Sequence, residues 1–321
     1  MELTAGNRTY LWQGDWAKLP PNVQLGYTHG VVEDRAGNIY VANQSPHAIA
    51  IFNSAGKFLN AWGSEYGPGA HGLTHSIESG KEFLYLANTG LNQVVKTTLT
   101  GEVVFTIATP PRPDIYTAEK KFVPTETAIG PDGRIYIADG YGQPWVHIYS
   151  PKAEYLSSFG GYGSEPGQLD QPHGISIDAR SGTPVVQVAN RANRRIDNFS
   201  LEGEFLRTAI RARELRFPCT TVHQGKDLYI PDLFCRVSIF DAANTLIGHL
   251  GDYVGGATLT SWDQLRSNQF PDLAGYPNIP HDKRQPGKFS SPHGLHVDAA
   301  GNIYVVEWIN DGRITRLQRV K

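Results

Sequence analysis

Histidines open four of the six units of a pattern that recurs along this chain. The six opening residues lie 46 to 50 positions apart, with a last interval of 74 positions, and they are His29, His75, Thr125, His173, Cys219 and His293. If the units form a ring, His75, His173 and His293 stand a third of a turn apart and approach one axis. Three imidazoles with an open position form a catalytic zinc site. We therefore expect these three residues to bind zinc or another divalent transition metal.

A structural role is the simpler interpretation for any one of these histidines, because its ring could hydrogen-bond a neighbouring unit. Polar residues also close the second strand of each unit, and they are Asn43, Asn88, Asp139, Asn190, Asp232 and Glu307. The residues that begin the first strand and those that end the second strand of each unit would emerge on one face. There they would surround an axial pocket, which is where ligands usually bind. The further pocket candidates are His29, Gln44, Asp139, Asp232 and Glu307. Cys219 and Cys235 could add soft metal ligands, but unrelated buried thiols are the simpler interpretation.

Short strands separated by turns must position these residues. Turns such as Ala36-Gly37-Asn38 and Asp132-Gly133 separate runs rich in Ile, Val and Tyr, as β-hairpins require. A further strand is expected at 57–62, 154–159 and 245–250. Four-stranded units at this period are typical of β-propeller blades. The sequence therefore predicts an all-β, six-bladed β-propeller that forms one domain over 1–321.

Two features at the ends of the pattern complete this prediction. The sixth unit has only three strands, so we expect 8–12 to supply its outer strand and close the ring without an exposed edge. The long last interval places a connection at 251–290 on the face where the histidines open. Long connections without repeats are usually functional or disordered, and this one carries Trp262, Phe270, Tyr276 and His281. We predict a lid over the pocket.

The composition narrows the classes of partner. A net charge of −2 and a pI near 6.6 give no basic field, so we expect no nucleic-acid partner; the arginines of 191–216 alternate with acidic residues, as on a solvated rim. No window approaches the ~18 apolar residues of a membrane span. Residues 1–9 lack an export signal, and two cysteines favour a reducing compartment. We expect a cytoplasmic protein, or a secreted or periplasmic one if a leader has been removed, that binds a small-molecule or peptide-like substrate.

The repeats resemble a known family. The stretch 34–43, DRAGNIYVAN, resembles the NHL repeat, and the resemblance extends over nearly the whole chain. Among NHL-type propellers the chain is similar to the peptidylglycine amidating lyases, which cleave a C-terminal α-hydroxyglycine at its C–N bond with a three-histidine zinc and a tyrosine. This resemblance implies that His75, His173 and His293 hold the zinc. It further implies that Tyr141, in Ile137-Ala138-Asp139-Gly140-Tyr141, is the catalytic base and that Arg191 contacts substrate.

The sequence departs from that family at three positions. Gln44 stands in the first turn where the family has an arginine, and Gly294 follows the last histidine where the family has an acidic residue. These two changes argue against a peptide substrate and a structural calcium ion. Gly142 replaces a half-cystine, in agreement with a reducing compartment. The metal and tyrosine could thus be retained for another substrate.

Taken together, the residues favour a metal-dependent, lyase-like enzyme that cleaves a carbinol C–N or similar bond at the channel mouth. Two other classes remain open. One is a metal-dependent hydrolase or lactonase on the same propeller, and the other is a protein-binding NHL scaffold whose histidines are structural. Fold alone does not choose among them, because propellers host many activities.

Overall fold

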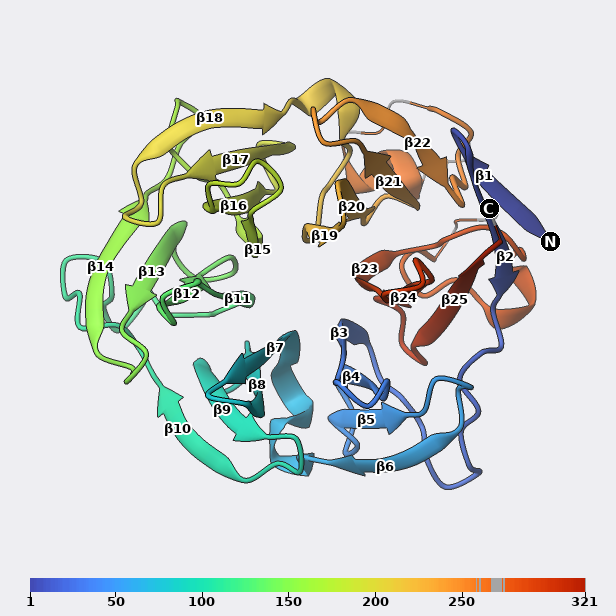
Figure 1. Ribbon diagram of the computed structural model, residues 1–321, viewed down its shortest axis with the longest axis horizontal. Helices are drawn as coiled ribbons and strands as arrows, with labels where there is room; N and C mark the ends of the chain where they lie inside the picture. Colours follow the sequence, from blue (N-terminus) through green and yellow to red (C-terminus); the bar gives the residue numbers. More distant parts are fainter. Residues whose placement is uncertain (258, 260, 267–272, 274, 321) are drawn as a thin grey trace.

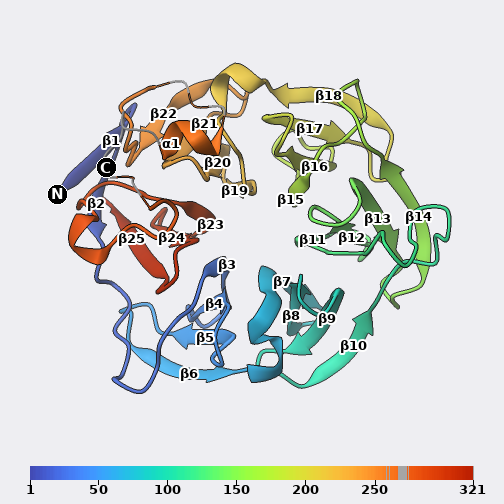
Figure 2. The ribbon, with the colours of Figure 1, turned by 180° about the vertical axis from the view of Figure 1, so that it is seen from behind.

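Six antiparallel β-sheets surround a central channel in the computed structural model, which describes residues 1–257, 259, 261–266, 273 and 275–320 (Figure 1). The innermost strands are β3(Thr28–Glu33), β7(Ala70–Glu78), β11(Glu126–Ile129), β15(Pro172–Asp178), β19(Val222–Gln224) and β23(Pro292–Val297). The same arrangement is seen from behind in Figure 2. The predicted six-bladed β-propeller is therefore confirmed.

Each blade is a meander whose second, third and fourth strands follow outwards. The second strands are β4(Ile39–Asn43), β8(Lys81–Asn88), β12(Ile135–Ala138), β16(Val185–Asn190), β20(Asp227–Asp232) and β24(Ile303–Glu307). The third strands are β5(Ile49–Phe52), β9(Gln93–Thr98), β13(Trp145–Tyr149), β17(Arg195–Phe199), β21(Arg236–Phe240) and β25(Arg313–Arg319). The fourth strands of blades one to five are β6(Phe58–Trp62), β10(Val103–Ile107), β14(Tyr155–Gly160), β18(Phe205–Ile210) and β22(Leu246–Leu250).

The hydrophobic core lies between neighbouring blades. Every residue of β4 and of β12 is buried, because each middle strand is covered on both faces by the adjacent sheets. One such interface joins blades one and two through Tyr40, Ile49 and Leu86. The outer strands are more exposed, as the pattern in β10 shows. The near-continuous apolar runs of the middle strands are thus explained by burial on two sides.

The ring closes as the sequence predicts. Strand β2(Arg8–Gln13) pairs with β25 of blade six, with Tyr10 opposite Arg319. A further strand that was not predicted, β1(Glu2–Ala5), pairs with β2 and lies beside β22 of blade five (Figure 1). Both ends of the chain therefore bind blade six, and the N-terminal strands cover the edge that β25 would otherwise expose.

The described part of the connection 251–290 contacts the rims of blades five and six. Its described part includes α1(Trp262–Leu265) and η4(His281–Lys283), and two other short 3₁₀ segments, η1(Ser64–Gly69) and η2(Ala212–Glu214), precede inner strands. Val254, Tyr276 and Ile279 pack in one apolar cluster with Leu233 and Phe234 of blade five. In the described part of the chain, no helix has the length and apolar character that a membrane crossing requires.

The lid function stays a prediction. Phe270 and the side chain of Trp262 lie outside the described residues. Tyr276 is buried, and its hydroxyl donates to the Leu233 carbonyl at 2.8 Å, so this ring anchors the connection to the rim. His281 is exposed.

Candidate active site

Four imidazoles meet at one end of the channel, and we call this group the histidine mouth. Its members, from β3, β7, β15 and β23, are His29, His71, His173 and His293. Ring centroids of contacting pairs lie 4.4 to 4.9 Å apart, and no ring is more than 4% exposed. The channel axis at this end is therefore lined by nitrogen ligands.

A break in strand pairing accompanies each of these histidines. In blade four the pairing of β15 with β16 skips His173, which lies between Pro172 and Gly174. The same shift in register occurs at the other three histidines. A β-bulge bends its strand and redirects a side chain, so the bulges turn the imidazoles into the channel.

A glycine follows each histidine of the mouth because neighbouring inner strands approach closely there. A Cβ atom on Gly294 would lie 2.2 Å from the His29 carbonyl oxygen, and one on Gly72 would lie 2.3 Å from the Thr125 carbonyl oxygen. No side chain fits at such distances. The His-Gly pair is therefore a structural requirement of the mouth as well as the source of its chemistry.

The prediction that His75 belongs to the metal trio is wrong, because His71 occupies that place. The two residues are four positions apart on β7, which corresponds to about 13 Å of β-strand. The His75 ring instead lies 2.9 Å from a carboxylate oxygen of Glu82. The missed signal is the triplet His71-Gly72-Leu73, which has the same His-Gly-aliphatic form as the openers of blades one, four and six.

Hydrogen bonds to the next blade orient three of the four rings. In each case the Nδ1–H donates to a backbone carbonyl: His71 to Thr125 at 2.7 Å, His173 to Cys219 at 2.8 Å and His293 to His29 at 3.2 Å. Such a bond fixes the tautomer and leaves the Nε2 lone pair free, as in metal-bound histidines. The structural and the metal-binding interpretations of these residues are therefore compatible.

All four imidazoles are neutral near pH 7. Burial and, to a smaller extent, the nearby Arg191 guanidinium lower the pKa of His71 to about 3. Burial likewise lowers the pKa values of the other three well below the ordinary value of 6.5. A neutral imidazole is the form that binds a metal.

His29 differs from the other three. Its Nδ1 lies 3.4 Å from Nε2 of His293, at the outer limit of a hydrogen bond. The Gln44 side chain is close enough to raise the pKa of the ring, but the buried Nε2 has no hydrogen-bond partner among the described residues. His29 therefore lies at the mouth, with Gln44 beside it, and their role as pocket residues stays a prediction.

Tyr141 reaches the same point from the turn after β12. Its hydroxyl lies 2.9 Å from Nε2 of His173 and 3.3 Å from Nε2 of His71. The residue is 41% exposed and lines an adjacent cavity, although its hydroxyl is enclosed by these side chains. Burial raises the pKa of Tyr141, and the guanidinium of Arg191 opposes that shift.

Arg191 is a buried cation without an acidic partner in any ion pair of the described residues. Its Nη1 lies 3.3 Å from the Tyr141 hydroxyl, its Nη2 donates to Sγ of Cys219 at 3.0 Å, and its Nε donates to the Pro218 carbonyl at 3.2 Å. The guanidinium also stacks 5.0 Å above the Phe217 ring. A buried cation of this kind favours an anionic or strongly polar ligand group.

A cavity of about 120 Å³ opens beside these groups. Its polar lining comes from Tyr141, Arg191, Gln171 and His293, and its apolar walls are Phe217, Leu233 and Trp308. The buried Oε1 of Gln171 has no donor among the described residues. The cavity combines an unpaired cation, an unpaired acceptor and apolar walls, which is the usual form of a small-ligand site.

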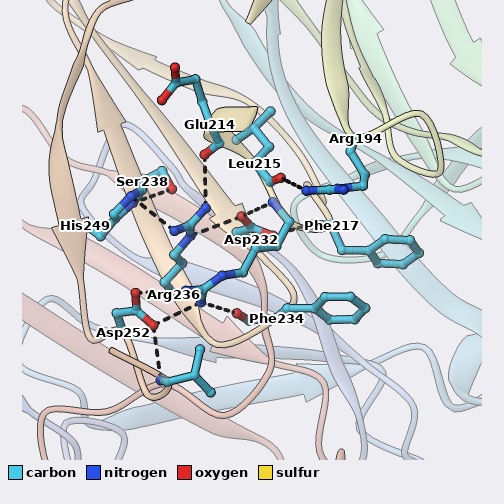
Figure 3. Close-up of polar contacts among 12 residues, drawn as sticks. Arg194, Glu214, Leu215, Phe217, Asp232, Phe234, Arg236, Ser238, His249 and Asp252 are labelled. Atoms are coloured by element: carbon cyan, nitrogen blue, oxygen red, sulfur yellow. Dashed lines mark hydrogen bonds and ion pairs between the residues drawn. The ribbon is translucent and has the colours of Figure 1, made fainter. Parts of the chain in front are cut away.

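The predicted pocket residues Asp139, Asp232 and Glu307 do not line this cavity, so that prediction is wrong. Their carboxylates instead accept backbone N–H groups of the loop that enters the same blade: Asp139 from Val123, Asp232 from Arg216 and Glu307 from Ser290, each at 2.7 Å. Figure 3 shows Asp232 in this role beside Arg236 and Phe217. Buried N–H groups at the loop need acceptors, and the strand-closing residues supply them.

Asp139 nevertheless shapes the site through the turn that carries Tyr141. Its carboxylate accepts the N–H groups of Val123 and Gln143, each at 2.7 Å, and the hydroxyl of Tyr116 at 2.8 Å. Burial raises the pKa of Asp139 to about 6. The carboxylate thus holds the turn 139–143, which positions the Tyr141 hydroxyl, against the loop at Val123.

The two cysteines occupy different environments. Cys219 lines the small space beneath the four imidazoles and contacts Arg191, whereas Sγ of Cys235 lies 2.9 Å from the Ser290 carbonyl. Burial raises the pKa of Cys219 to about 11, so its thiol is protonated near neutral pH. The interpretation of two unrelated buried thiols agrees with these positions.

The mouth fits a divalent metal by the chemistry of its donors. The Nε2 lone pairs of His71, His173 and His293 converge there, and among the described residues only the Tyr141 hydroxyl and the long contact from His29 can donate to them. The ligand nitrogens of His29, His71 and His293 all lie within 4.8 Å of one another. Neighbouring side chains supply too few donors for these Nε2 lone pairs, and a bound cation would accept them.

Comparisons with known proteins agree with an NHL-type propeller. No protein-family model matches the chain. Over 98% of its length the chain is 24% identical to the peptidyl-alpha-hydroxyglycine alpha-amidating lyase 1 of Drosophila melanogaster. Over 54% it is 25% identical to the NHL repeat-containing protein 3 of Mus musculus. The chain spans 60% and 52% of the lengths of these two relatives.

Solved structures share the fold at low identity. A streptogramin B lyase is 10% identical and has a TM-score of 0.62, with 99% of this chain and 100% of that one covered. A gluconolactonase from Xanthomonas campestris is 12% identical and has a TM-score of 0.60, with 98% and 91% covered. At these identities the similarity concerns the propeller itself.

Proposed function

We propose that this NHL-type propeller is a metal-dependent lyase that breaks the C–N bond of a carbinol, with Tyr141 as the group that moves the proton. The observation that carries the proposal is the position of the Tyr141 hydroxyl. It lies within 3.3 Å of His71, His173 and Arg191, beside a cavity of about 120 Å³.

His71, His173 and His293 are the residues that would hold the metal, because their Nδ1–H groups donate to backbone carbonyls and their Nε2 lone pairs remain for a metal. A divalent metal on these ligands would polarise a substrate oxygen and stabilise a phenolate at Tyr141. Zinc suits neutral imidazoles, although other transition metals share this preference.

The reaction needs one group that first accepts and then returns a proton. Cleavage of HO–C–N converts the hydroxyl into a carbonyl, and the electrons of the C–N bond leave with nitrogen, which gains the proton that oxygen loses. Tyr141 can accept this proton at its hydroxyl oxygen and deliver it to nitrogen. Arg191 donates to the same oxygen at 3.3 Å and lowers the pKa of Tyr141 against the effect of burial.

The cavity indicates a small substrate with a polar end. Arg191 presents an unpaired guanidinium to an anionic or carbonyl group, and the free Oε1 of Gln171 can accept an N–H. The walls formed by Phe217 and Trp308 suit an apolar neighbour. An N-acyl-α-hydroxyglycine has these three features, and the relative from Drosophila melanogaster carries such a substrate in its name.

The test is turnover of an N-acyl-α-hydroxyglycine by zinc-loaded protein prepared without a histidine tag, with glyoxylate release as the readout. A small lactone is the comparison substrate. Glyoxylate release without lactone opening supports the lyase. Lactone opening alone would assign the mouth to a hydrolase, and zinc-free protein that turns over neither substrate would leave the NHL scaffold as the function.

A further inference from the structure

Two observations select different trios at the histidine mouth. Orientation selects His71, His173 and His293, whose Nδ1 atoms all donate to carbonyls of the next blade. Distance selects His29, His71 and His293, whose ligand nitrogens lie within 4.8 Å of one another. His71 and His293 belong to both trios, so the difference concerns His29 and His173.

A site with all four histidines as ligands agrees with both observations. This inference rests on the metal site of the proposed function: we propose that His29 supplies a fourth imidazole, so that four histidines hold the metal and a substrate oxygen would bind as a fifth ligand. The fourth ring comes from blade one, next to the blades that carry His293 and His71. Its ring centroid lies 4.5 Å from that of His293 and 4.4 Å from that of His71.

The contact between His29 and His293 has the spacing of two ligands on one metal. Nδ1 of His29 and Nε2 of His293 are 3.4 Å apart. Zinc–nitrogen bonds of about 2.0 to 2.1 Å at a tetrahedral angle place two nitrogens about 3.3 to 3.4 Å apart. The observed distance is long for a hydrogen bond, and it agrees with a shared cation.

The remaining atoms of His29 fit this role. Ligation through Nδ1 places the proton on Nε2, the atom without a hydrogen-bond partner among the described residues. The Gln44 side chain, near enough to affect the pKa of this ring, is the acceptor that we assign to this Nε2–H. Gln44 would then orient His29 as backbone carbonyls orient the other three rings.

A site of four neutral imidazoles keeps the full double charge of the metal. Arg191 adds a further positive charge nearby, without an acidic partner in any ion pair of the described residues. Such a centre attracts an anionic substrate group more strongly than one with a carboxylate ligand. The inference therefore strengthens the expectation of an acidic substrate.

X-ray absorption spectroscopy of the zinc-loaded wild type counts the imidazoles directly, without any variant. Four imidazole nitrogens support the proposal. Three or fewer around bound zinc overturn it and leave the proposed lyase intact. Protein that binds no zinc overturns this inference and the proposed function together.

A zinc titration of His29→Ala provides the second test, with His75→Ala as the matched control on an inner strand. We expect zinc affinity to fall by about a hundredfold or more in His29→Ala. That loss exceeds the one expected for a residue that only hydrogen-bonds a metal ligand. Added imidazole should restore part of that affinity, and His75→Ala should bind as the wild type does. Unchanged affinity in folded His29→Ala overturns the proposal, and if that variant does not fold, the absorption count decides.

Discussion

The two ends of the channel carry histidines on the same strands but in opposite surroundings. On β7, His71 lies in the mouth, whereas His75 pairs with Glu82 at 2.9 Å. On β23, His293 lies in the mouth, whereas the His296 ring lies 3.2 Å from Glu33. His75 and His296 line a separate cavity of about 390 Å³ further along the channel.

The difference shows that the neighbours of a histidine decide what its ring can do. In the mouth, backbone carbonyls accept the Nδ1–H of three of the four rings, and no carboxylate forms an ion pair with any of the four among the described residues. The Nε2 lone pairs are then free for a metal. In the far cavity each ring instead contacts a carboxylate oxygen.

Among the changes that distinguish the mouth from the far cavity, removal of the metal should reduce turnover the most. Protein dialysed against a chelator should lose turnover of an N-acyl-α-hydroxyglycine by about a thousandfold or more, because Lewis-acid polarisation contributes several kcal/mol to such steps. Zinc should restore it. The initial rate of glyoxylate release is the measurement, and full activity in metal-free protein would rule out a metal-dependent step.

Tyr141→Phe should have the next largest effect. The change removes the hydroxyl that contacts His173 and keeps the ring, so turnover should fall by about a hundredfold or more, as for loss of a general base. Zinc content and the thermal unfolding midpoint should stay at the wild-type values. Equal turnover of the variant and the wild type would remove Tyr141 from the mechanism.

A smaller effect is expected on the pH dependence of stability. In metal-free protein, burial lowers the pKa of His71 to about 3 from the ordinary 6.5. Between these values the unfolded chain binds a proton that the folded chain does not, so the free energy of unfolding decreases as the pH falls. The loss is about 1.4 kcal/mol per pH unit for one such group.

His71→Gln should remove this contribution. Urea unfolding of metal-free protein between pH 7 and pH 4.5 should therefore show a shallower pH slope for His71→Gln than for the wild type. His75→Gln is the control because it removes a histidine from the same strand outside the mouth. An identical slope in the wild type and His71→Gln would mean that His71 is not held neutral by burial.

The smallest effect is expected in the far cavity. The side chains of His75 and Glu82 are 16% and 20% exposed, and ion pairs in partly solvated positions contribute about 1 kcal/mol or less. His75→Gln should therefore change the free energy of unfolding by no more than that and leave turnover unchanged. A large loss of turnover would show that the two ends of the channel are coupled.

Much of this architecture can be predicted from the sequence because the same pattern recurs in six units. The strand-turn-strand signals predict all six blades, and the incomplete sixth unit predicts the pairing of β2 with β25. His29, His173, His293, Tyr141 and Arg191 also lie at the mouth. The histidines follow from the order of blades around a ring, whereas Tyr141 and Arg191 follow from the resemblance to the amidating lyases.

The errors arise where local geometry departs from the repeat. Strand β7 is longer than the other inner strands and begins at Ala70, so counting from the neighbouring units selects His75, further along the strand, instead of His71. Asp232 and Glu307 end their strands where loop N–H groups need acceptors, and their side chains therefore turn away from the axis. Sequence spacing does not contain either fact, although the His-Gly-aliphatic triplet marks the correct histidine.

The central claim is that the mouth, and not the far cavity, binds a catalytic metal. Its most direct test is a zinc titration of tag-free wild type, His71→Ala and His75→Ala, with bound metal measured by elemental analysis. We predict one tightly bound zinc per chain in the wild type and in His75→Ala, and none in His71→Ala. A wild type that takes up no zinc at micromolar concentration, or zinc lost in His75→Ala and kept in His71→Ala, would contradict the account.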